Sequence, residues 1–298
     1  MKVLLIGGAG YIGRPLVELL RERADTVSAD IRPGPGVDET LDMRDPGEVY
    51  RLFLKTKPDV AVVTAYMLSR AAAADPMRAV QTNILGMTNV FQTASDLGIR
   101  RVVFASSGSI YGRSVDFPQQ PINETVECHP SMLYARMKRI NEWLAEHYNA
   151  NFGTEIVSYR ISGPHGRGKA TGGQTPYDTV VTAVLDGQKR IVLPWTPDTM
   201  FRFIQIQDAA ASFLPVILAD SVKHRVYSAP GFAISIRELA ETAKSVAQLE
   251  CDFAEPGRTI EFVARIDSSR YEEEFSFRPR PMADWMREDV GMAAAATV

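Results

Sequence analysis

The stretch Lys2-Val3-Leu4-Leu5-Ile6-Gly7-Gly8-Ala9-Gly10-Tyr11-Ile12-Gly13 determines the architecture of this 298-residue chain. Its beginning is almost entirely apolar and predicts a buried strand over 2–6. Glycine then recurs at 7, 10 and 13, and a helical pattern begins near Arg14. A short buried strand that passes through a glycine-rich turn into a helix is typical of the first unit of a doubly wound α/β fold.

The three glycines also favour a binding site for phosphate groups. Gly7 permits the tight turn, Gly10 lets the backbone approach a ligand closely, and Gly13 lets the helix pack against the strand. The helix N-terminus adds amide donors and a partial positive charge. We therefore expect Gly7, Gly10, Tyr11, Ile12 and Gly13 to bind the pyrophosphate of a dinucleotide, rather than to form a simple glycine-rich turn.

The second predicted strand ends in a carboxylate, which bears on the choice of cofactor. Asp30 closes the strand over 26–30, where it can accept hydrogen bonds from an adenosine ribose. A carboxylate there repels the 2′-phosphate of NADP and favours NAD, whereas the nearby Arg32 could accommodate that phosphate. Asp42 and Met43 are expected to contact the adenine, and the alternative is a polar turn that starts a helix.

Short apolar runs alternate with longer helical patterns through the first two thirds of the chain, as in repeated βαβ units with a parallel sheet. The predicted strands are 2–6, 26–30, 59–63, 101–106 and 154–159, and the predicted helices are 13–23, 46–55, 76–97 and 131–150. The runs at 60–63 and 102–105 are apolar on both strand faces, so we expect central strands covered by helices on both sides.

The pattern changes after Arg160, because Gly and Pro cluster through 163–176 and the regular elements become shorter. We therefore expect a Rossmann-type, NAD-binding domain over 1–160 that includes the helix at 131–150. A smaller, mainly substrate-binding subdomain over 161–289 would follow. The tail over 290–298 consists of small residues with little to bury, which predicts fraying.

The composition excludes several classes of function. The chain is 45% hydrophobic and 23% charged with a formal net charge of −3, so it lacks the basic surface that nucleic acids require. The first glycines come too early for a signal peptide, and no apolar run approaches the roughly 20 residues of a membrane span. We expect a cytoplasmic protein in which Cys128 and Cys251 are free thiols and bind no metal.

Two further motifs point to proton transfer. Ser106-Ser107-Gly108-Ser109-Ile110-Tyr111-Gly112 follows an apolar strand, and Tyr134 and Lys138 lie four residues apart in the next helical stretch. One helical turn places both side chains on one face, where the lysine charge lowers the tyrosine pKa and makes the phenol a usable acid or base. Ser107 can orient a substrate oxygen. Such a Tyr–Lys pair is common by itself, and its occurrence beside a dinucleotide loop is what indicates catalysis.

Together these motifs resemble the extended short-chain dehydrogenase/reductase family, which contains nucleotide-sugar epimerases and dehydratases, over roughly residues 1–289. The resemblance implies that Tyr134 is the catalytic acid or base and that Lys138 holds the nicotinamide ribose and tunes Tyr134. It also implies that Ser107 positions the reacting hydroxyl. Asn83, in the helix at 76–97, is expected to be structural rather than catalytic.

The resemblance further implies a homodimer that pairs the helices at 76–97 and 131–150 of two subunits. The apolar positions that could form its seam are Leu133, Ile140, Trp143 and Leu144. Contacts within the core of one chain explain these residues equally well.

The chain departs from the family pattern at two places. Gly108 and Ser109 stand where sugar-nucleotide dehydratases usually carry acidic residues, which disfavours dehydration and decarboxylation. In the family motif Arg-x-x-Asn-x-Tyr-Gly-Pro, Gly163 replaces the Asn that often contacts a nucleotide-sugar, and His165 replaces the Tyr. The candidate substrate-binding residues are Ser107, Ser109, Gly163 and His165.

Three functions remain open. An epimerase would oxidise and re-reduce a sugar hydroxyl with tightly held NAD, whereas a dehydrogenase or ketoreductase for a free sugar, sugar acid or other secondary alcohol would release NADH. A regulator that senses dinucleotides without catalysis would not need the Ser107, Tyr134 and Lys138 set. The family resemblance favours an NAD-dependent epimerase acting on a sugar derivative. The segment 166–174, with Arg167 and Lys169, is expected to be either a loop that closes over an anionic substrate or an ordinary exposed loop.

Overall fold

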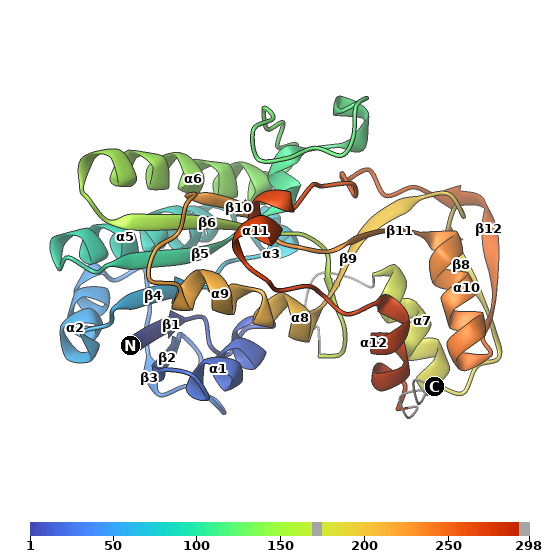
Figure 1. Cartoon of the computed structure of the whole chain (residues 1–298), viewed down its shortest axis with the longest axis horizontal. Helices are drawn as coiled ribbons and strands as arrows, with labels where there is room; N and C mark the ends of the chain where they lie inside the picture. The colour runs from blue at the N-terminus through green and yellow to red at the C-terminus, as the bar shows by residue number, and fades with distance from the viewer. Residues whose placement is uncertain (169–174, 292–298) are drawn as a thin grey trace.

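A parallel sheet of seven strands forms the centre of the protein, whose computed structural model describes residues 1–168 and 175–291 (Figure 1). In spatial order its strands are β10 (Val226–Ser228), β6 (Glu155–Ile161), β5 (Arg101–Ser107), β4 (Val60–Val63), β1 (Lys2–Ile6), β2 (Asp25–Asp30) and β3 (Glu39–Thr40). Every pair of neighbours is parallel. The predicted doubly wound, Rossmann-type fold is therefore confirmed, and the strand order reverses between β1 and β4.

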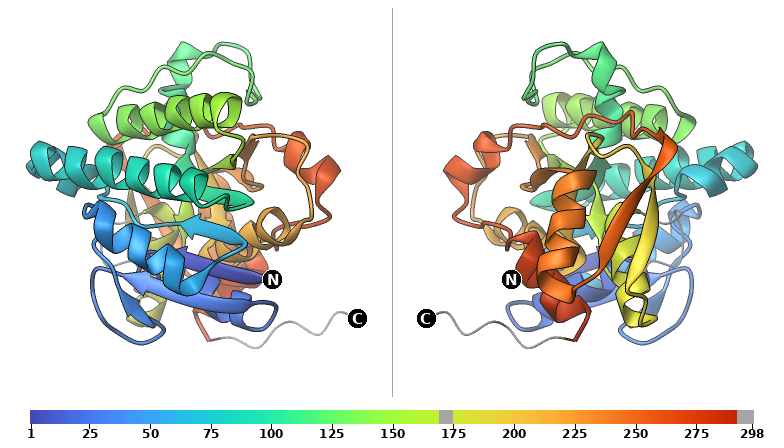
Figure 2. Two further views of the ribbon diagram at one scale, coloured as in Figure 1. Left: turned by 90° about the vertical axis from the view of Figure 1, so that its left-hand side faces the viewer. Right: turned by 90° about the vertical axis from the view of Figure 1, so that its right-hand side faces the viewer.

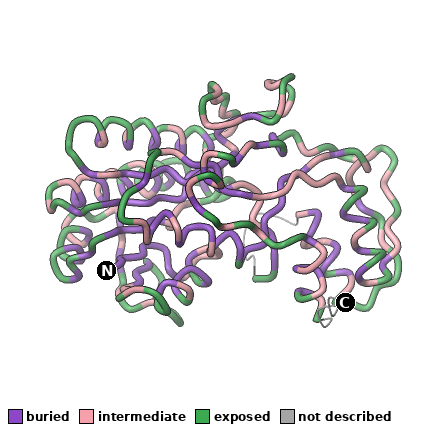
Figure 3. The backbone as a smooth tube through the Cα atoms, viewed as in Figure 1, coloured by how far each residue is buried: buried purple, intermediate pink, exposed green. Residues whose placement is uncertain are grey.

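Helices cover both faces of this sheet because its central strands are apolar on both faces. Val3 and Leu5 of β1 pack against α1 (Gly13–Arg21), whereas Leu4 and Ile6 face the core that contains Phe53. The first face is also covered by α8 (Ile206–Ala211), α9 (Phe213–Leu218) and α11 (Ser269–Glu274). The second face carries α2 (Pro46–Thr56), α5 (Met87–Asp96) and α6 (Leu133–Asn151). All residues of β4 and β5 are buried, as predicted for central strands (Figure 3).

The helix predicted over 76–97 is present but not uniform. It consists of α4 (Pro76–Val80), the π-helical segment η1 (Gln81–Gly86) and α5, and α3 (Ser69–Ala74) precedes it. The wider π-helical turn brings Asn83 into the interior, where its side chain is fully buried. Such an insertion is often found at functional sites.

The second part of the molecule lies at one end of the large sheet (Figures 1 and 2). It contains a three-stranded sheet of β7 (Pro164–His165), β9 (Met200–Gln205) and β11 (Phe232–Ser235), and a two-stranded sheet of β8 (Arg190–Trp195) and β12 (Glu250–Arg258). These strands pack with α7 (Pro176–Leu185), α10 (Ile236–Ala247) and α12 (Met282–Asp289).

The chain returns from this second part to the large sheet twice. β10 pairs with β6, and α8, α9 and α11 share the core of the first sheet face. The expected boundary at residue 160 therefore does not separate two spatial units. The expectation for the C-terminal tail falls largely on 292–298, which lie outside the described residues.

The cysteines and the helix lengths can be compared with the predictions from composition. Cys128 and Cys251 are both free thiols, as predicted. Within residues 1–168 and 175–291, no helix combines the length and apolar character that crossing a membrane requires.

Candidate active site and cofactor cradle

The glycine-rich turn after β1 lies against the turn after β4, where the strand order reverses. Gly7 has a φ of 107°, and a Cβ at this position would lie 2.4 Å from the backbone nitrogen of Ala65. A Cβ on Gly13 would lie 2.0 Å from the carbonyl oxygen of Gly7. Only bare backbone fits here, at the N-terminus of α1, and this is the form of a cradle for the pyrophosphate of a dinucleotide.

Asp30 stands beside this cradle at the end of β2. Its carboxylate accepts hydrogen bonds from the backbone N–H groups of Ala9 and Arg32, each at 3.0 Å. The Arg32 side chain is 72% exposed, and its Nε lies 3.8 Å from the carboxylate. Asp30 thus braces the glycine turn from the place where a ribose acceptor is expected.

Three further residues are predicted to contact the cofactor: Tyr11, Asp42 and Met43. Tyr11 donates a hydrogen bond to the carbonyl oxygen of Gly166 at 2.8 Å and so ties the cradle to the second part of the molecule. Asp42 is paired with Arg44, whose hydrogen bonds lower the pKa of the Asp42 carboxyl. Met43 is buried in the core beside α5. Adenine contacts by Asp42 and Met43 stay predictions.

Ser107 and Tyr134 are brought together because β5 ends at Ser107 and α6 begins one residue before Tyr134. The Ser107 Oγ accepts a hydrogen bond from the Ser109 backbone N–H at 3.2 Å and lies 2.9 Å from the Ser109 Oγ. Loss of hydration raises the pKa of Tyr134 to about 12, and hydrogen bonding with Ser107 opposes this rise. Burial thus favours the protonated phenol, so a charge beside Tyr134 is needed before this side chain can act as a base.

Lys138 lies one helical turn beyond Tyr134 and is 3% exposed. Its Nζ donates a hydrogen bond to the carbonyl oxygen of Ala105 at 2.5 Å and lies 5.7 Å from the centroid of the Tyr134 ring. Burial lowers the pKa of Lys138 well below its usual value, and the carboxylate of Glu142 opposes this effect. The predicted Tyr–Lys pair is thus assembled, with a lysine whose charge depends on its neighbours.

Two features of this site were missed by sequence reasoning. Tyr66, in the segment after β4, places its ring directly against the Lys138 ammonium. Glu142, one turn beyond Lys138, forms a buried ion pair with Arg160 and accepts a hydrogen bond from Ser106 at 2.6 Å. The helical spacing from Lys138 could have revealed Glu142, whereas Tyr66 belongs to no recognisable motif.

Gly163 and His165, predicted to bind substrate, are enclosed by backbone. Gly163 has a φ of 59°, and a Cβ there would lie 2.1 Å from the carbonyl oxygen of Arg202. His165 is 4% exposed, its Nδ1 lies 2.8 Å from the Thr175 Oγ1 and its Nε2 lies 2.9 Å from the same Arg202 oxygen. Its ring also stacks on Phe203. These contacts favour structural roles for both residues, and substrate binding by either one stays a prediction.

The loop expected to close over a substrate is only partly described. Gly166 donates a backbone hydrogen bond to Asp178 at 3.0 Å, which fixes the start of the loop to α7. Arg167 is exposed. Lys169 and the rest of the segment up to residue 174 lie outside the described residues, so the expectation of closure remains open.

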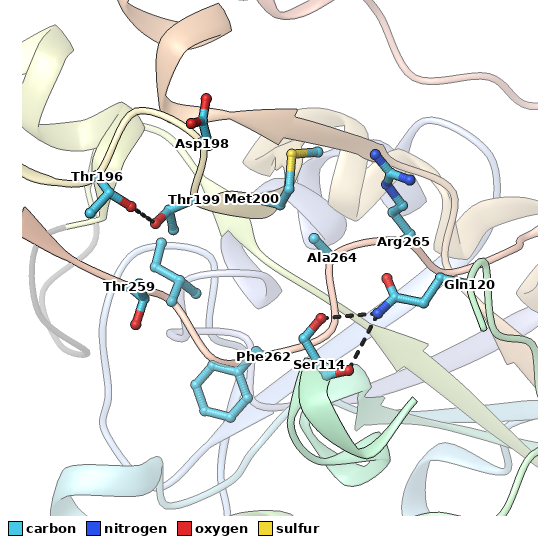
Figure 4. Close-up of a pocket in the computed structure, with 11 residues that line it drawn as sticks. Ser114, Gln120, Thr196, Asp198, Thr199, Met200, Thr259, Phe262, Ala264 and Arg265 are labelled. Carbon is cyan, nitrogen blue, oxygen red and sulfur yellow. Dashed lines mark hydrogen bonds between the residues drawn. The ribbon is translucent and has the colours of Figure 1, made fainter. Parts of the chain in front are cut away.

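A cavity of about 340 Å³ opens between the segment after Tyr111, the turn that joins β8 to β9, and the segment after β12 (Figure 4). Its lining residues are Ser114, Gln120, Thr196, Asp198, Thr199, Met200, Thr259, Ile260, Phe262, Ala264 and Arg265. Gln120 donates a hydrogen bond to the Ser114 Oγ at 2.9 Å across one wall. Ser107, Tyr134 and Lys138 are not among the residues that line this cavity.

The sequence matches a known protein family. Residues 3–229 match the NAD dependent epimerase/dehydratase family. The chain belongs to this family. It is accordingly an NAD-dependent enzyme of the extended short-chain dehydrogenase/reductase class, and its glycine cradle, with Asp30 at the neighbouring strand end, fits that cofactor.

Similar members of the family have different activities. The chain is 26% identical over 267 residues to the mitochondrial L-threonine 3-dehydrogenase of Bos taurus, which covers 85% of this chain and 70% of that protein. It is 31% identical over 173 residues to the uronate dehydrogenase of Pseudomonas syringae pv. tomato, 54% of this chain and 58% of that protein. The structure of the Thermus thermophilus UDP-glucose 4-epimerase complex with NAD has a TM-score of 0.79 at 23% identity, and 98% of each chain is covered. At that identity the likeness shows the fold alone.

Proposed function

We propose that this family member is a net NAD-dependent dehydrogenase that oxidises the secondary alcohol of a small polar substrate without a nucleotide. A hydroxy amino acid or a sugar acid is the substrate class to test. This proposal departs from the epimerase expected from the family resemblance and takes the alternative that the sequence left open. Its proton-transfer residues are the ones that the sequence predicts, Ser107, Tyr134 and Lys138.

The observation that carries the proposal is the closure of the backbone at Gly163. The family's nucleotide-sugar contact there is an Asn side chain, but in this chain the carbonyl oxygen of Arg202 lies only 2.1 Å from the position that a Cβ would take. The Arg202 guanidinium is itself buried, and it donates hydrogen bonds to the carbonyl oxygens of Ala229, Ala264 and Ile266 at 3.0, 3.3 and 2.8 Å. Gly163 has no room for a side chain, and the Arg202 side chain binds only backbone oxygens in these contacts. Neither residue is then available to a nucleotide, which favours a substrate that lacks one.

The chemistry of the proposed reaction is divided between cofactor and protein. When bound, NAD supplies the acceptor for the hydride that leaves the alcohol carbon. Ser107 holds the substrate oxygen by a hydrogen bond, and Tyr134 takes the hydroxyl proton as the carbonyl forms. Burial raises the pKa of Tyr134. A positive charge on Lys138, one helical turn away, would favour the ionised phenol. Removing the proton during oxidation avoids a full alkoxide charge.

The relatives indicate which substrates to test. One is an L-threonine 3-dehydrogenase and another a uronate dehydrogenase. Both names describe net oxidation of a hydroxylated carboxylate. The substrate class that we propose for this chain is therefore a hydroxylated carboxylate.

The experiment starts with the nucleotide content of the purified, denatured protein. Native protein is then mixed with NAD and L-threonine, uronates, free sugars or UDP-sugars, and absorbance at 340 nm is followed. The proposal expects sustained NADH formation with one substrate that lacks a nucleotide, at a rate that falls by about a hundredfold or more in Tyr134→Phe. Stoichiometric bound NAD, no net NADH, and interconversion of UDP-sugar epimers detected by chromatography would overturn it in favour of an epimerase.

A further inference from the structure

Tyr66 lies along one face of the catalytic helix α6 and contacts three successive positions of that face. Its ring meets the ring of Tyr134 edge-on, with centroids 5.5 Å apart and an interplanar angle of 87°. The Nζ of Lys138 lies 3.2 Å from the centroid of the Tyr66 ring. The Tyr66 hydroxyl accepts a hydrogen bond from the Asn141 side chain at 3.1 Å. Positions 134, 138 and 141 follow helical spacing, so one side chain spans the whole working face.

The contact with Lys138 is a cation–π interaction at short range. The ring face of an aromatic side chain attracts an ammonium group through its quadrupole when the two lie within about 6 Å. A charged Lys138 has three N–H donors, and one of them is directed to the carbonyl oxygen of Ala105. The Tyr66 ring shields another side of the ammonium from solvent, which leaves little freedom for the lysine to turn.

The Tyr66 ring is held in place by a buried amide network. The Asn83 side chain, in the π-helical segment, accepts a hydrogen bond from the backbone N–H of Met67 at 2.8 Å. It donates another to the backbone carbonyl oxygen of Met67 at 3.0 Å. Asn141 donates to the backbone oxygen of Asn83 at 2.8 Å and to the Tyr66 hydroxyl. The segment that carries Tyr66 is thus fastened to both helices, as expected if Asn83 is structural.

We propose that Tyr66 is a positioning residue that keeps the Lys138 side chain charged and in place beneath Tyr134. The inference concerns the site on which the proposed function rests, and it adds a residue that contacts the lysine rather than the substrate. Tyr66 sets the range of pH over which Lys138 can tune the phenol of Tyr134.

The other groups around Lys138 compensate its positive charge only in part, so the Tyr66 ring is needed to stabilise the ammonium. The titratable groups that face it are Tyr66 from the segment after β4, and Tyr134 and Glu142 from its own helix. Glu142 is a source of negative charge that acts on Lys138, but its carboxylate already accepts hydrogen bonds from Arg160 and Arg139. These two cations neutralise most of its charge, while the main effect on Lys138 is the loss of hydration. Among the described residues, the carbonyl oxygen of Ala105 and the ring face of Tyr66 are the groups in contact with the ammonium that can compensate its charge.

The test measures the ionisation of Lys138 directly, so it needs no substrate and its failure is distinct from failure of the proposed function. Full-length protein is labelled with lysine carrying ¹³C at Cε, and the Lys138 resonance is assigned by its loss in Lys138→Arg. Its pKa is then titrated by NMR with and without saturating NAD. The variants are Tyr66→Leu, which removes the ring, and Tyr66→Phe, which keeps the ring but loses the hydroxyl. Tyr50→Leu, at an exposed tyrosine of α2, is the matched control.

The proposal expects Tyr66→Leu to lower the Lys138 pKa by about one unit, while Tyr66→Phe and Tyr50→Leu stay within about 0.3 unit of the unmodified protein. An unchanged pKa in Tyr66→Leu overturns it, as does a fall in Tyr66→Phe as large as in Tyr66→Leu. If Tyr66→Leu does not fold, the proposal is tested instead by the proton chemical shifts of Lys138 in the unmodified protein. The Hε protons of Lys138 must show the upfield ring-current shift of an ammonium stacked on an aromatic face, and a shift typical of exposed lysine overturns the proposal.

Discussion

Glu142 and Arg160 form a buried bidentate ion pair, one helical turn beyond the catalytic Lys138. The Arg160 Nε lies 3.0 Å from Glu142 Oε1, and its Nη2 lies 2.8 Å from Oε2. Glu142 is one helical turn beyond Lys138 on α6, and Arg160 lies near the end of β6. The pair therefore fixes the catalytic helix to the carboxyl end of the sheet, and no water is needed to satisfy either charge.

Removing one partner of this pair should cost considerable stability. We expect Glu142→Gln to lower the free energy of unfolding by about 3–5 kcal/mol, because Arg160 would remain charged and buried without its counterion. The control is Glu146→Gln on the same helix, whose exposed carboxylate pairs with Arg139 and should change stability by less than about 1 kcal/mol. Urea unfolding followed by circular dichroism measures both. Equal effects in the two variants would contradict a structural role for the buried pair.

Tyr134→Phe tests the assignment of the acid or base. The ring and its edge contact with Tyr66 are kept, but the proton carrier is lost, so we expect turnover to fall by about a hundredfold or more. NADH binding, measured by fluorescence titration, should change less than about twofold. Tyr50→Phe, at an exposed position, is the control. Undiminished turnover of Tyr134→Phe would sink the assignment.

The sequence predicts those parts of the structure that depend on short-range patterns. The apolar runs of β4 and β5 identify central strands because each lies buried on both faces. The spacing of Tyr134 and Lys138 identifies one helical face, and the glycines at 7 and 13 stand where a Cβ has no room. Each of these features is complete within a few residues.

Features that join distant segments could not be predicted in this way. Tyr66 contacts Lys138 only because the turn after β4 and the helix α6 meet beside neighbouring strands, and no local pattern marks the residue. The return of β10 to the large sheet depends equally on long-range packing. At His165 the family motif predicts a substrate contact, which stays a prediction, whereas the contacts that bury the ring come from the distant strand β9.

Asp30 is expected to govern the choice between NAD and NADP. Asp30→Asn keeps an acceptor for the backbone N–H of Ala9 but removes the charge that repels a 2′-phosphate. We expect the ratio of the Kd of NADPH to that of NADH to fall by about tenfold or more, as measured by fluorescence titration. Adding Arg32→Ala should reverse much of this gain, because Arg32 is exposed beside the site. An unchanged ratio in Asp30→Asn would exclude Asp30 from this role.

The two directions of the reaction should depend on pH with opposite sign. Burial raises the pKa of Tyr134 to about 12, and hydrogen bonding with Ser107 opposes this rise. Alcohol oxidation needs the ionised phenol, so its rate should rise as the pH increases. Ketone reduction needs the protonated phenol, so its rate should fall over the same range. Initial rates from pH 6 to 10 in both directions, taken with saturating cofactor, test this; parallel profiles would contradict proton transfer by Tyr134.

Trp143 is expected to lie in a dimer interface on the outer face of α6. Leu133, Ile140 and Trp143 are all exposed, Trp143 at 56%, whereas Leu144, also expected in the seam, packs against the core of its own subunit. Exposed aromatic and aliphatic residues clustered on one helix are typical of contacts between subunits. Trp143→Glu would bury a charge there, so we expect it to weaken association by about thirtyfold or more in sedimentation experiments. Val192→Glu, at an exposed apolar position of β8, should leave assembly unchanged. Equal dissociation of both variants, or a monomeric unmodified protein at micromolar concentration, would exclude this face as the interface and leave α6 to serve the active site alone.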